Sequence, residues 1–380
     1  MRKGDVVMEI RKRPPAQDVG RILGGGMSPE DFIKMMAETE INLETFDKVS
    51  PEEAHDFVEV CERLGDNAYS YAKKNEEAGH TETASEYYFN ANALYRLGDY
   101  GIKNFDEEKY RIYGKLVSSF KLHKKLAKNE NVQYIEIPYE GKWMPAYLAL
   151  PNHATKDTPV VICVVGATGF KEENFVIAKT VVDRGCAALI FDGPGQGECN
   201  LNRELYLTEN NYDGAVLAVV DYLKENPAVG NRIGIMGVSF GGYLATSAVC
   251  RYPNEFAGLV VRGGCSQLDQ LTMHTFAGID RFYLYNFLNK FNVETLDEAA
   301  EISHRMNFEA DLKNITCPVL VEHTEEDPVI GIEGAKTIYE KVSSTDKEYY
   351  EIEGNVHCGN NEAQKTCTYG VDWLLDRLMD

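Results

Sequence analysis

The spacing of apolar residues changes near residue 130 of the chain. Before that point apolar residues recur every three to four positions, the period of a helix with one buried face, as in Phe57, Cys61, Leu64, Ala68 and Tyr71. The segments 28–31 (SPED) and 50–53 (SPEE) each offer a serine N-cap followed by proline and acidic residues, which is typical of helix starts. Further helices are expected over 81–98 and 105–129. The pattern therefore predicts a helical module over residues 1–130.

From residue 131 onward the apolar residues alternate with polar ones or form short continuous runs. Residues 132–151 alternate on both sides of Glu140 and Gly141, which predicts a β-hairpin. Short apolar runs then alternate with helical stretches, which predicts a mostly parallel sheet with helices on both faces. An aromatic-rich helical stretch interrupts this series at 266–310, and we interpret it as an inserted cap segment. Residues 131–380 are thus expected to form one α/β domain.

The amino-acid composition excludes several classes of binding partner. The 60 acidic residues outnumber the 39 Lys and Arg residues, and the formal net charge of −21 argues against nucleic acid and against anionic membrane surfaces. No apolar stretch of signal-peptide or transmembrane length follows the basic N-terminus. The nine cysteines form no C-x-x-C pair, and no metal-binding or nucleotide motif is found. We expect a cytoplasmic protein with reduced cysteines, no cofactor and no metal.

Three reactive side chains follow predicted strands. Ser239 lies in GVSFG after the strand RIGIM, Asp327 follows VLVEH, and His357 follows KEYYEIE. Ligands of open α/β sheets bind beyond the carboxyl ends of the strands, so the three residues are expected to meet at one edge. A serine hydroxyl needs a base, and an imidazole base needs a carboxylate to orient it. The sequence therefore predicts a catalytic triad with Ser239 as nucleophile, His357 as base and Asp327 as the orienting acid.

An oxyanion hole should accompany this triad. The helix that follows Ser239 begins at Phe240, whose backbone N–H is one expected donor. The loop VVGATGFKEEN after an earlier strand would supply the second donor, from Ala167 or Thr168. A tight turn between strand and helix would account for the same glycines, but the order of the triad favours the oxyanion role.

Two other segments admit more than one interpretation. Asp269 follows the strand FAGLVVRGG and is a rival for the triad acid; alternatively it positions the substrate or caps the inserted helices. The segment FDGPGQGE (191–198) follows a strand like a dinucleotide fingerprint, but Glu198 stands where the last glycine is needed. We therefore reject a nucleotide site and expect Asp192 to support a turn near the active site.

The segments IPYEGKWMPAYLALP, GATGFKEE, FDGPGQGE, RIGIMGVSFGGYLA, HTEEDPVI and NVHCG together resemble the α/β-hydrolase superfamily. Within it the chain is similar to the branch of 2,6-dihydroxypseudooxynicotine hydrolase, fungal pigment chain-shortening hydrolases and FrsA-like esterases. The resemblance implies an α/β-hydrolase fold and assigns the triad roles to the same three residues. Because HTEED replaces the His-Gly that many relatives carry before the acid, Glu325 or Glu326 could be mistaken for the triad acid, although Asp327 fits the spacing best.

The expected activity is hydrolysis of a small carbonyl compound. The resemblance and the aromatic cap favour cleavage of a carbon–carbon bond next to a ketone in a β-diketone-like or aryl-ketone substrate. Ester hydrolysis uses the same triad and stays open as the alternative. A peptidase or a ligand receptor without catalysis is less favoured, since a receptor should have lost a triad residue. The N-terminal helices are expected to act as a lid or to mediate homodimerisation.

Overall fold

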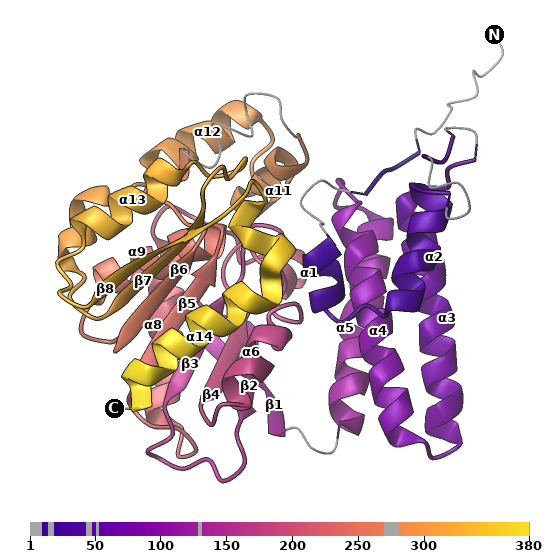
Figure 1. Ribbon diagram of the computed structural model, residues 1–380, viewed down its shortest axis with the longest axis horizontal. Helices are drawn as coiled ribbons and strands as arrows, with labels where there is room; N and C mark the ends of the chain where they lie inside the picture. Colours follow the sequence, from indigo (N-terminus) through magenta and orange to yellow (C-terminus); the bar gives the residue numbers. More distant parts are fainter. Residues whose placement is uncertain are drawn as a thin grey trace. The chain divides into compact units, whose positions relative to one another are not determined.

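The computed structural model in Figure 1 describes residues 10–13, 19–42, 48–50, 53–127, 131–269 and 281–379. The chain divides into two compact units, Met1–Ala127 and Lys128–Asp380, and each is described by itself. Among the described helices, none has both the length and the apolar character that crossing a bilayer requires.

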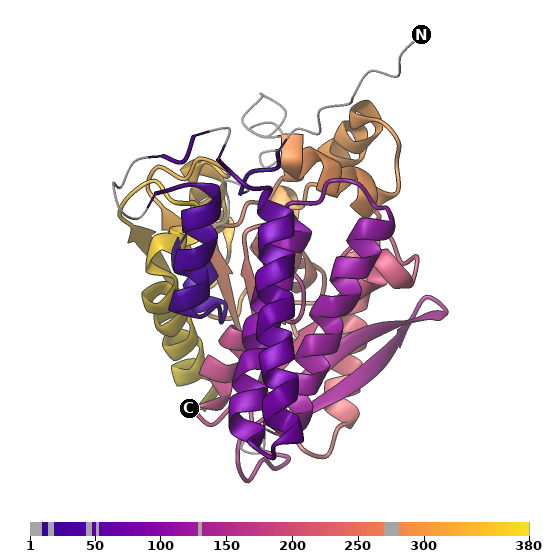
Figure 2. The same ribbon diagram turned by 90° about the vertical axis from the view of Figure 1, so that its right-hand side faces the viewer.

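The first unit is helical, as expected. Three long helices lie side by side in Figure 2, where they are coloured indigo to purple. Two shorter helices precede them in the chain. The five are α1 (Val19–Gly24), α2 (Pro29–Thr39), α3 (Phe57–Glu77), α4 (Thr81–Tyr100) and α5 (Glu107–Leu126). A buried ion pair joins α4 to α5, with Lys109 Nζ 2.6 Å from Asp99 Oδ2 and the Asp99 side chain fully buried.

One of the two predicted helix starts is correct and the other is wrong. Ser28 caps α2, and its hydroxyl accepts a hydrogen bond from the Asp31 N–H. In contrast, α3 begins at Phe57 with Asp56 as its N-cap, and Ser50 bonds to the side chain of Glu53 instead. Asp56 is fixed by Arg11, whose N–H and guanidinium both donate to its carboxylate. The residue that caps this helix is therefore held by a contact across 45 residues of sequence.

The second unit is built on an eight-stranded sheet with the order β1-β2-β4-β3-β5-β6-β7-β8. The predicted hairpin pairs β1 with β2, β2 pairs antiparallel with β4, and all other pairs are parallel. The sheet is therefore mostly parallel, as predicted. Its strands are β1 (Asn131–Tyr139), β2 (Lys142–Leu150), β3 (Val160–Val164), β4 (Ala187–Phe191), β5 (Ile233–Val238), β6 (Gly258–Arg262), β7 (Val319–Thr324) and β8 (Lys347–Ile352).

Helices cover both faces of this sheet (Figure 1). One face packs against α6 (Phe175–Val182) and α14 (Ala363–Met379). The other packs against α8 (Asn211–Glu225), α9 (Phe240–Arg251) and α13 (Ile332–Lys341). Strands β3 to β6 are almost completely buried, which explains their continuous apolar runs. This arrangement is the predicted α/β-hydrolase fold.

The inserted segment contains α11 (Arg281–Phe291) and α12 (Leu296–Arg305), followed by the 3₁₀ turn η2 (Glu309–Asn314). Residues 270–280 of the predicted cap lie outside the described residues. Phe287 of α11 is buried, and its ring packs edge-on against Phe240 at a centroid distance of 5.3 Å. Since Phe240 directly follows Ser239, the insertion packs next to the residue expected to react. A short helix that the sequence did not predict, α7 (Gly197–Asn202), follows β4.

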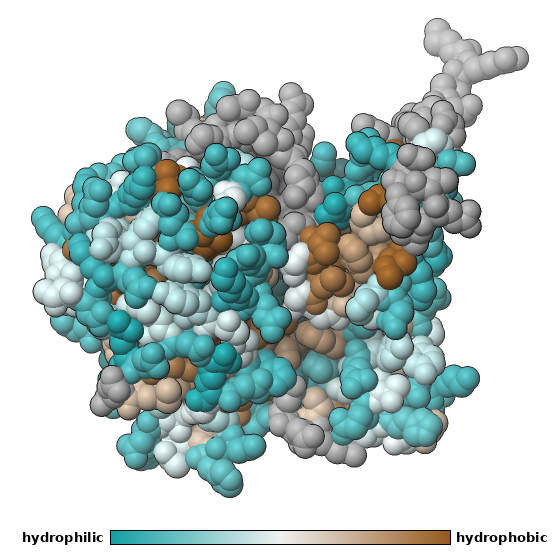
Figure 3. All heavy atoms as spheres, viewed as in Figure 1, coloured by the Kyte–Doolittle hydropathy of each residue, from teal (hydrophilic) through white to brown (hydrophobic). Residues whose placement is uncertain are grey.

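The surface of the second unit over α13 and α14 is mainly hydrophilic on the face shown in Figure 3. On the first unit, α1 and α2 expose the larger apolar side chains Val19, Leu23 and Ile33 by 36–50%. Dimerisation through the N-terminal helices stays a prediction.

Candidate active site

Ser239 occupies a sharp turn between β5 and α9. Its backbone has φ 58° and ψ −127°, a conformation that residues other than glycine rarely adopt. The Ser239 N–H donates to the Arg262 carbonyl of β6 at 2.7 Å, which ties the turn to the neighbouring strand. Such strain persists only where the surroundings enforce it, and it is often found at functional sites.

Two glycines make this turn possible. A Cβ at Gly237 would lie 2.1 Å from the Gly241 oxygen, and one at Gly241 would lie 2.4 Å from the Val164 oxygen. Both distances are far inside van der Waals contact, so neither position accepts a larger residue. The G-x-S-x-G pattern is therefore a steric requirement of the strand-to-helix turn.

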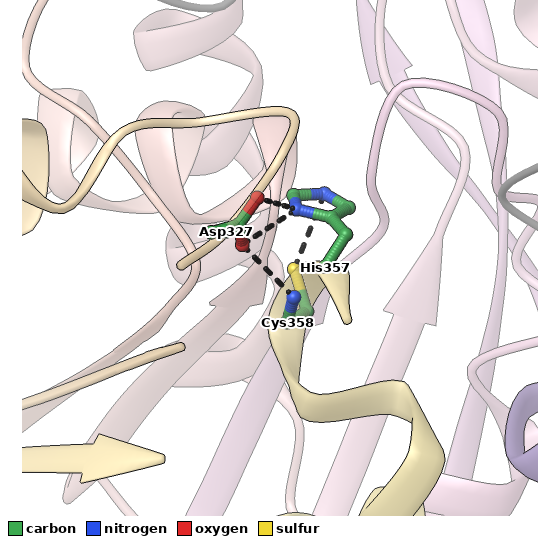
Figure 4. Close-up of side chains that lie close together, drawn as sticks. All are labelled: Asp327, His357 and Cys358. Carbon is green, nitrogen blue, oxygen red and sulfur yellow. Dashed lines mark hydrogen bonds and ion pairs between the residues drawn. The ribbon is translucent and has the colours of Figure 1, made fainter. Parts of the chain in front are cut away.

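The three residues expected to form a triad are in hydrogen-bond contact. His357 Nε2 lies 2.8 Å from Ser239 Oγ, and His357 Nδ1 lies 2.8 and 2.9 Å from the two oxygens of Asp327. Figure 4 shows the Asp327 carboxylate facing the imidazole ring of His357. The residues come from the turns after β5, β7 and β8, which end at the same edge of the parallel sheet. The chain thus has the geometry of a Ser-His-Asp triad.

Asp327 is a fixed, ionised partner for this imidazole. Its side chain is fully buried, and its oxygens accept hydrogen bonds from the backbone N–H groups of Val329, Ile330 and Cys358. Burial opposes ionisation, but the charge of His357 and these hydrogen bonds lower the pKa of Asp327 to about 2.

The pKa of His357 shifts in the opposite direction. Burial by itself disfavours the imidazolium, whereas the adjacent Cys358 sulfur and the Asp327 carboxylate favour it. The net effect is to raise the pKa of His357 above its ordinary value. Cys358 and Asp327 each act on the imidazole through both charge and a hydrogen bond, and both contribute to the raised pKa of His357.

The rival acids do not contact this histidine. Glu325 and Glu326 are exposed on the turn that buries Asp327. The carboxylate of Asp269 lies 3.4 Å from Nδ1 of the exposed His304, at the start of the inserted segment. The structure therefore brings Asp327, and none of the alternatives, to His357.

The expected oxyanion donors flank Ser239. Phe240 is the first residue of α9, so its N–H has no acceptor inside the helix. The loop after β3 passes close by: a Cβ on Gly166 would lie 3.4 Å from Ser239 Cβ and 3.9 Å from its Oγ. Ala167 and Thr168 follow directly in this loop and are buried. Both segments therefore border the serine, as a two-donor site requires.

Sequence analysis missed two neighbours of Asp327 and His357. Cys358 has a left-handed backbone, and its Sγ lies 3.3 Å from His357 Nε2 (Figure 4). His323, on β7, lies within 2.9 Å of the Ile330 carbonyl through Nε2 and so fixes the turn that carries Asp327. Burial lowers the pKa of His323, so this imidazole is neutral at neutral pH. Only its position, four residues before Asp327, hinted at this role.

Asp327, His357 and Cys358 also offer oxygen, nitrogen and sulfur atoms within 4.8 Å of one another, the donor types of a transition-metal site. Their donor atoms are committed to hydrogen bonds, however: Asp327 to three backbone N–H groups and to His357, and His357 Nε2 to Ser239. Hydrogen bonding among the protein groups accounts for the cluster.

Comparison with known proteins agrees with this geometry. The model of the prolyl oligopeptidase family matches residues 174–364, half of the chain, a range that includes Ser239, Asp327 and His357. The chain belongs to the prolyl oligopeptidase family. Within this family of α/β-hydrolases it is similar to proteins that are named hydrolases.

Two relatives and one solved structure show what this chain is similar to. It is 32% identical to 2,6-dihydropseudooxynicotine hydrolase of Paenarthrobacter nicotinovorans over 247 residues, 64% of each chain. It is 30% identical to the hydrolyase poxO of Penicillium oxalicum over 197 residues, 49% of this chain and 45% of the relative. The crystal structure of 2,6-dihydroxy-pseudo-oxynicotine hydrolase superposes with a TM-score of 0.81 at 26% identity, covering 95% of this chain and 96% of that one.

Proposed function

We propose that this protein is a serine hydrolase that cleaves a carbon–carbon bond next to a ketone in a small β-diketone-like or aryl-ketone substrate. The observation that carries the proposal is the 2.8 Å contact of Ser239 Oγ with His357 Nε2, together with Asp327 on Nδ1. A hydroxyl so placed can lose its proton to the imidazole as it attacks a carbonyl carbon.

In the first half-reaction Ser239 Oγ bonds to the ketone carbon while His357 Nε2 takes its proton. The carbonyl oxygen becomes an oxyanion that accepts hydrogen bonds from Phe240 N–H and from Ala167 or Thr168 N–H. Asp327 stabilises the imidazolium that forms and keeps Nδ1 protonated.

The carbon–carbon bond next to the former carbonyl carbon then breaks. In a ketone substrate the leaving group is a carbanion, stabilised by conjugation in the substrate, and the imidazolium of His357 delivers the proton to it. Water, deprotonated by His357, next attacks the acyl-enzyme and releases the carboxylic acid and Ser239. An ester would follow the same course with an alkoxide as leaving group, so the triad by itself serves both reactions.

Similarity to 2,6-dihydropseudooxynicotine hydrolase supports the carbon–carbon reaction. The contact of Phe287 with Phe240, next to Ser239, supports the interpretation of residues 266–310 as a cap beside the site. Asp269, which does not contact His357, is proposed to position a substrate carbonyl or hydroxyl. Carboxylesterase activity on a small acyl ester is the alternative function.

Product analysis distinguishes these reactions. Purified protein is incubated separately with β-diketones, C-acylated phenols, p-nitrophenyl esters and a proline-containing peptide. It is expected to cleave the β-diketones to a carboxylic acid and a shorter ketone, and the C-acylated phenols to a carboxylic acid and the free phenol. Mass spectrometry of the products gives the bond that breaks. Fast ester turnover without ketone cleavage would contradict the carbon–carbon reaction, and peptide cleavage alone would indicate a peptidase.

The rate should fall in acid, because only the neutral imidazole accepts the serine proton. Since the pKa of His357 is raised, the half-maximal point of kcat/KM should lie above the ordinary histidine pKa of about 6.5. A pH profile of kcat/KM measures this directly. A rate that is independent of pH through this region, or that rises on acidification, would rule out His357 as the base.

A further inference from the structure

The loop after β3, which carries the expected oxyanion donors, is bound on both sides by residues of the segment FDGPGQGE (191–198). Gln196 Nε2 donates to the Val165 carbonyl at 3.0 Å, and Asp192 Oδ1 accepts from the Lys171 N–H at 2.8 Å. Ala167 and Thr168 lie between these two anchor points in the chain. The segment that resembled a nucleotide motif thus fixes both ends of the loop.

Gln196 is itself held in one orientation. Its side-chain oxygen accepts from the Gly193 N–H at 3.1 Å and from the Tyr212 hydroxyl at 2.8 Å, and the residue is 1% exposed. With the oxygen engaged by two donors, the amide nitrogen must face the Val165 carbonyl. The hydrogen bond from Gln196 to the Val165 carbonyl therefore has a fixed direction.

Asp192 forms the second anchor at the end of β4. It is fully buried, and its other oxygen, Oδ2, accepts from Lys171 Nζ at 2.9 Å and from the Glu198 N–H at 3.0 Å. Lys171 is fully buried too, and its ammonium also lies 2.9 Å from Glu172 Oε1 and 3.2 Å from Glu198 Oε2. A Cβ on Gly197 would lie 2.3 Å from Asp192 Oδ2, so this glycine makes room for the anchor.

Buried ionic contacts such as those of Lys171 contribute little net stability, because the desolvation of the charges offsets their attraction. These contacts have a larger effect on geometry, because the charged side chains and the backbone that they bind are held in fixed positions. An oxyanion donor displaced by a fraction of an ångström loses most of its effect. The donor at Phe240 is fixed by α9, whereas the donor at Ala167 depends on the loop that Asp192 and Gln196 hold.

We propose that Asp192 and Gln196 are positioning residues that aim the Ala167 N–H at the oxyanion. They touch no reacting atom and act through the loop after β3. The inference rests on the proposed serine chemistry, and it gives the segment FDGPGQGE a role in transition-state stabilisation.

The test compares two inhibitors that differ in one atom. Diethyl p-nitrophenyl phosphate would phosphorylate Ser239 with its P=O oxygen in the oxyanion hole, whereas its phosphorothioate analogue places a sulfur there, a weak hydrogen-bond acceptor. Removing one oxyanion donor costs about 10²–10³ in rate. Asp192→Asn and Gln196→Leu are therefore expected to slow the P=O reaction about 10- to 100-fold, and the P=S reaction less than about threefold. Release of p-nitrophenol gives both rate constants.

Asp99→Asn is the matched control, because it makes the same change in a fully buried Asp–Lys pair of the other unit. Its P=O to P=S rate ratio should equal that of the wild type. Equal slowing with both inhibitors in Gln196→Leu, or the same ratio change in Asp99→Asn, would overturn the positioning role. If Asp192→Asn does not fold, Gln196→Leu decides alone. A wild type that does not react with the P=O compound would contradict the serine nucleophile and not the anchors.

Discussion

Replacing Ser239 by alanine is expected to abolish labelling by a fluorophosphonate probe and to lower kcat about 10⁶-fold. The substitution removes only the Oγ that attacks, and the turn keeps its hydrogen bond from the Ser239 N–H to Arg262. The fold should therefore survive while the nucleophile is lost. Gel fluorescence of the labelled protein and turnover of the substrate found by product analysis measure the two effects.

Ser247→Ala provides the control for this experiment. Ser247 lies on the same helix, α9, and its hydroxyl bonds to Asp213 at 3.1 Å, with no contact to His357. It should label as the wild type does. Because triad residues act as a unit, Ser239→Ala combined with His357→Ala should be about as slow as either single variant. Equal labelling of wild type and Ser239→Ala would end the nucleophile assignment.

The fold was largely predictable because its signals are local. Buried parallel strands such as Val160–Val164 read as continuous apolar runs, and the turn at Glu140 and Gly141 separates two alternating strands. The error at Ser50 shows the limit of local signals. SPEE has the residues of a helix start, yet the helix begins at Phe57, because Arg11 fixes Asp56 as its cap.

The candidate site divides in the same way. Ser239, Asp327 and His357 follow strands of a parallel sheet, so chain order alone brings them to one edge. The residues that hold the neighbouring loop act through contacts between segments distant in sequence, and residue spacing does not predict such contacts. Gln196 reaches back 31 residues to Val165, and Asp192 reaches 21 residues to Lys171. For that reason the sequence indicated a supporting role for Asp192 but not the loop that it holds.

Replacing Asp327 by asparagine should be the second most damaging change. Asparagine keeps the size of the side chain, but it removes the charge and can donate to Nδ1, which favours the imidazole tautomer with its proton on Nε2. That tautomer cannot accept the serine proton, and kcat is expected to fall about 10⁴-fold. The remaining activity should have its acidic limb at lower pH than the wild type, because the carboxylate that raises the pKa of His357 is gone.

Asp269→Asn tests the rival acid by the same chemical change. Its carboxylate faces His304 and not His357, so the pH limb should stay where it is in the wild type. If Asp269 positions the substrate, KM rises while labelling of Ser239 by the fluorophosphonate is unchanged, since that probe needs only the nucleophile and the base. Asp269 would be assigned as the triad acid if Asp269→Asn lost labelling and shifted the acidic limb of its pH–rate profile while Asp327→Asn stayed active. The pH limb therefore separates an acid that orients the imidazole from one that only binds substrate.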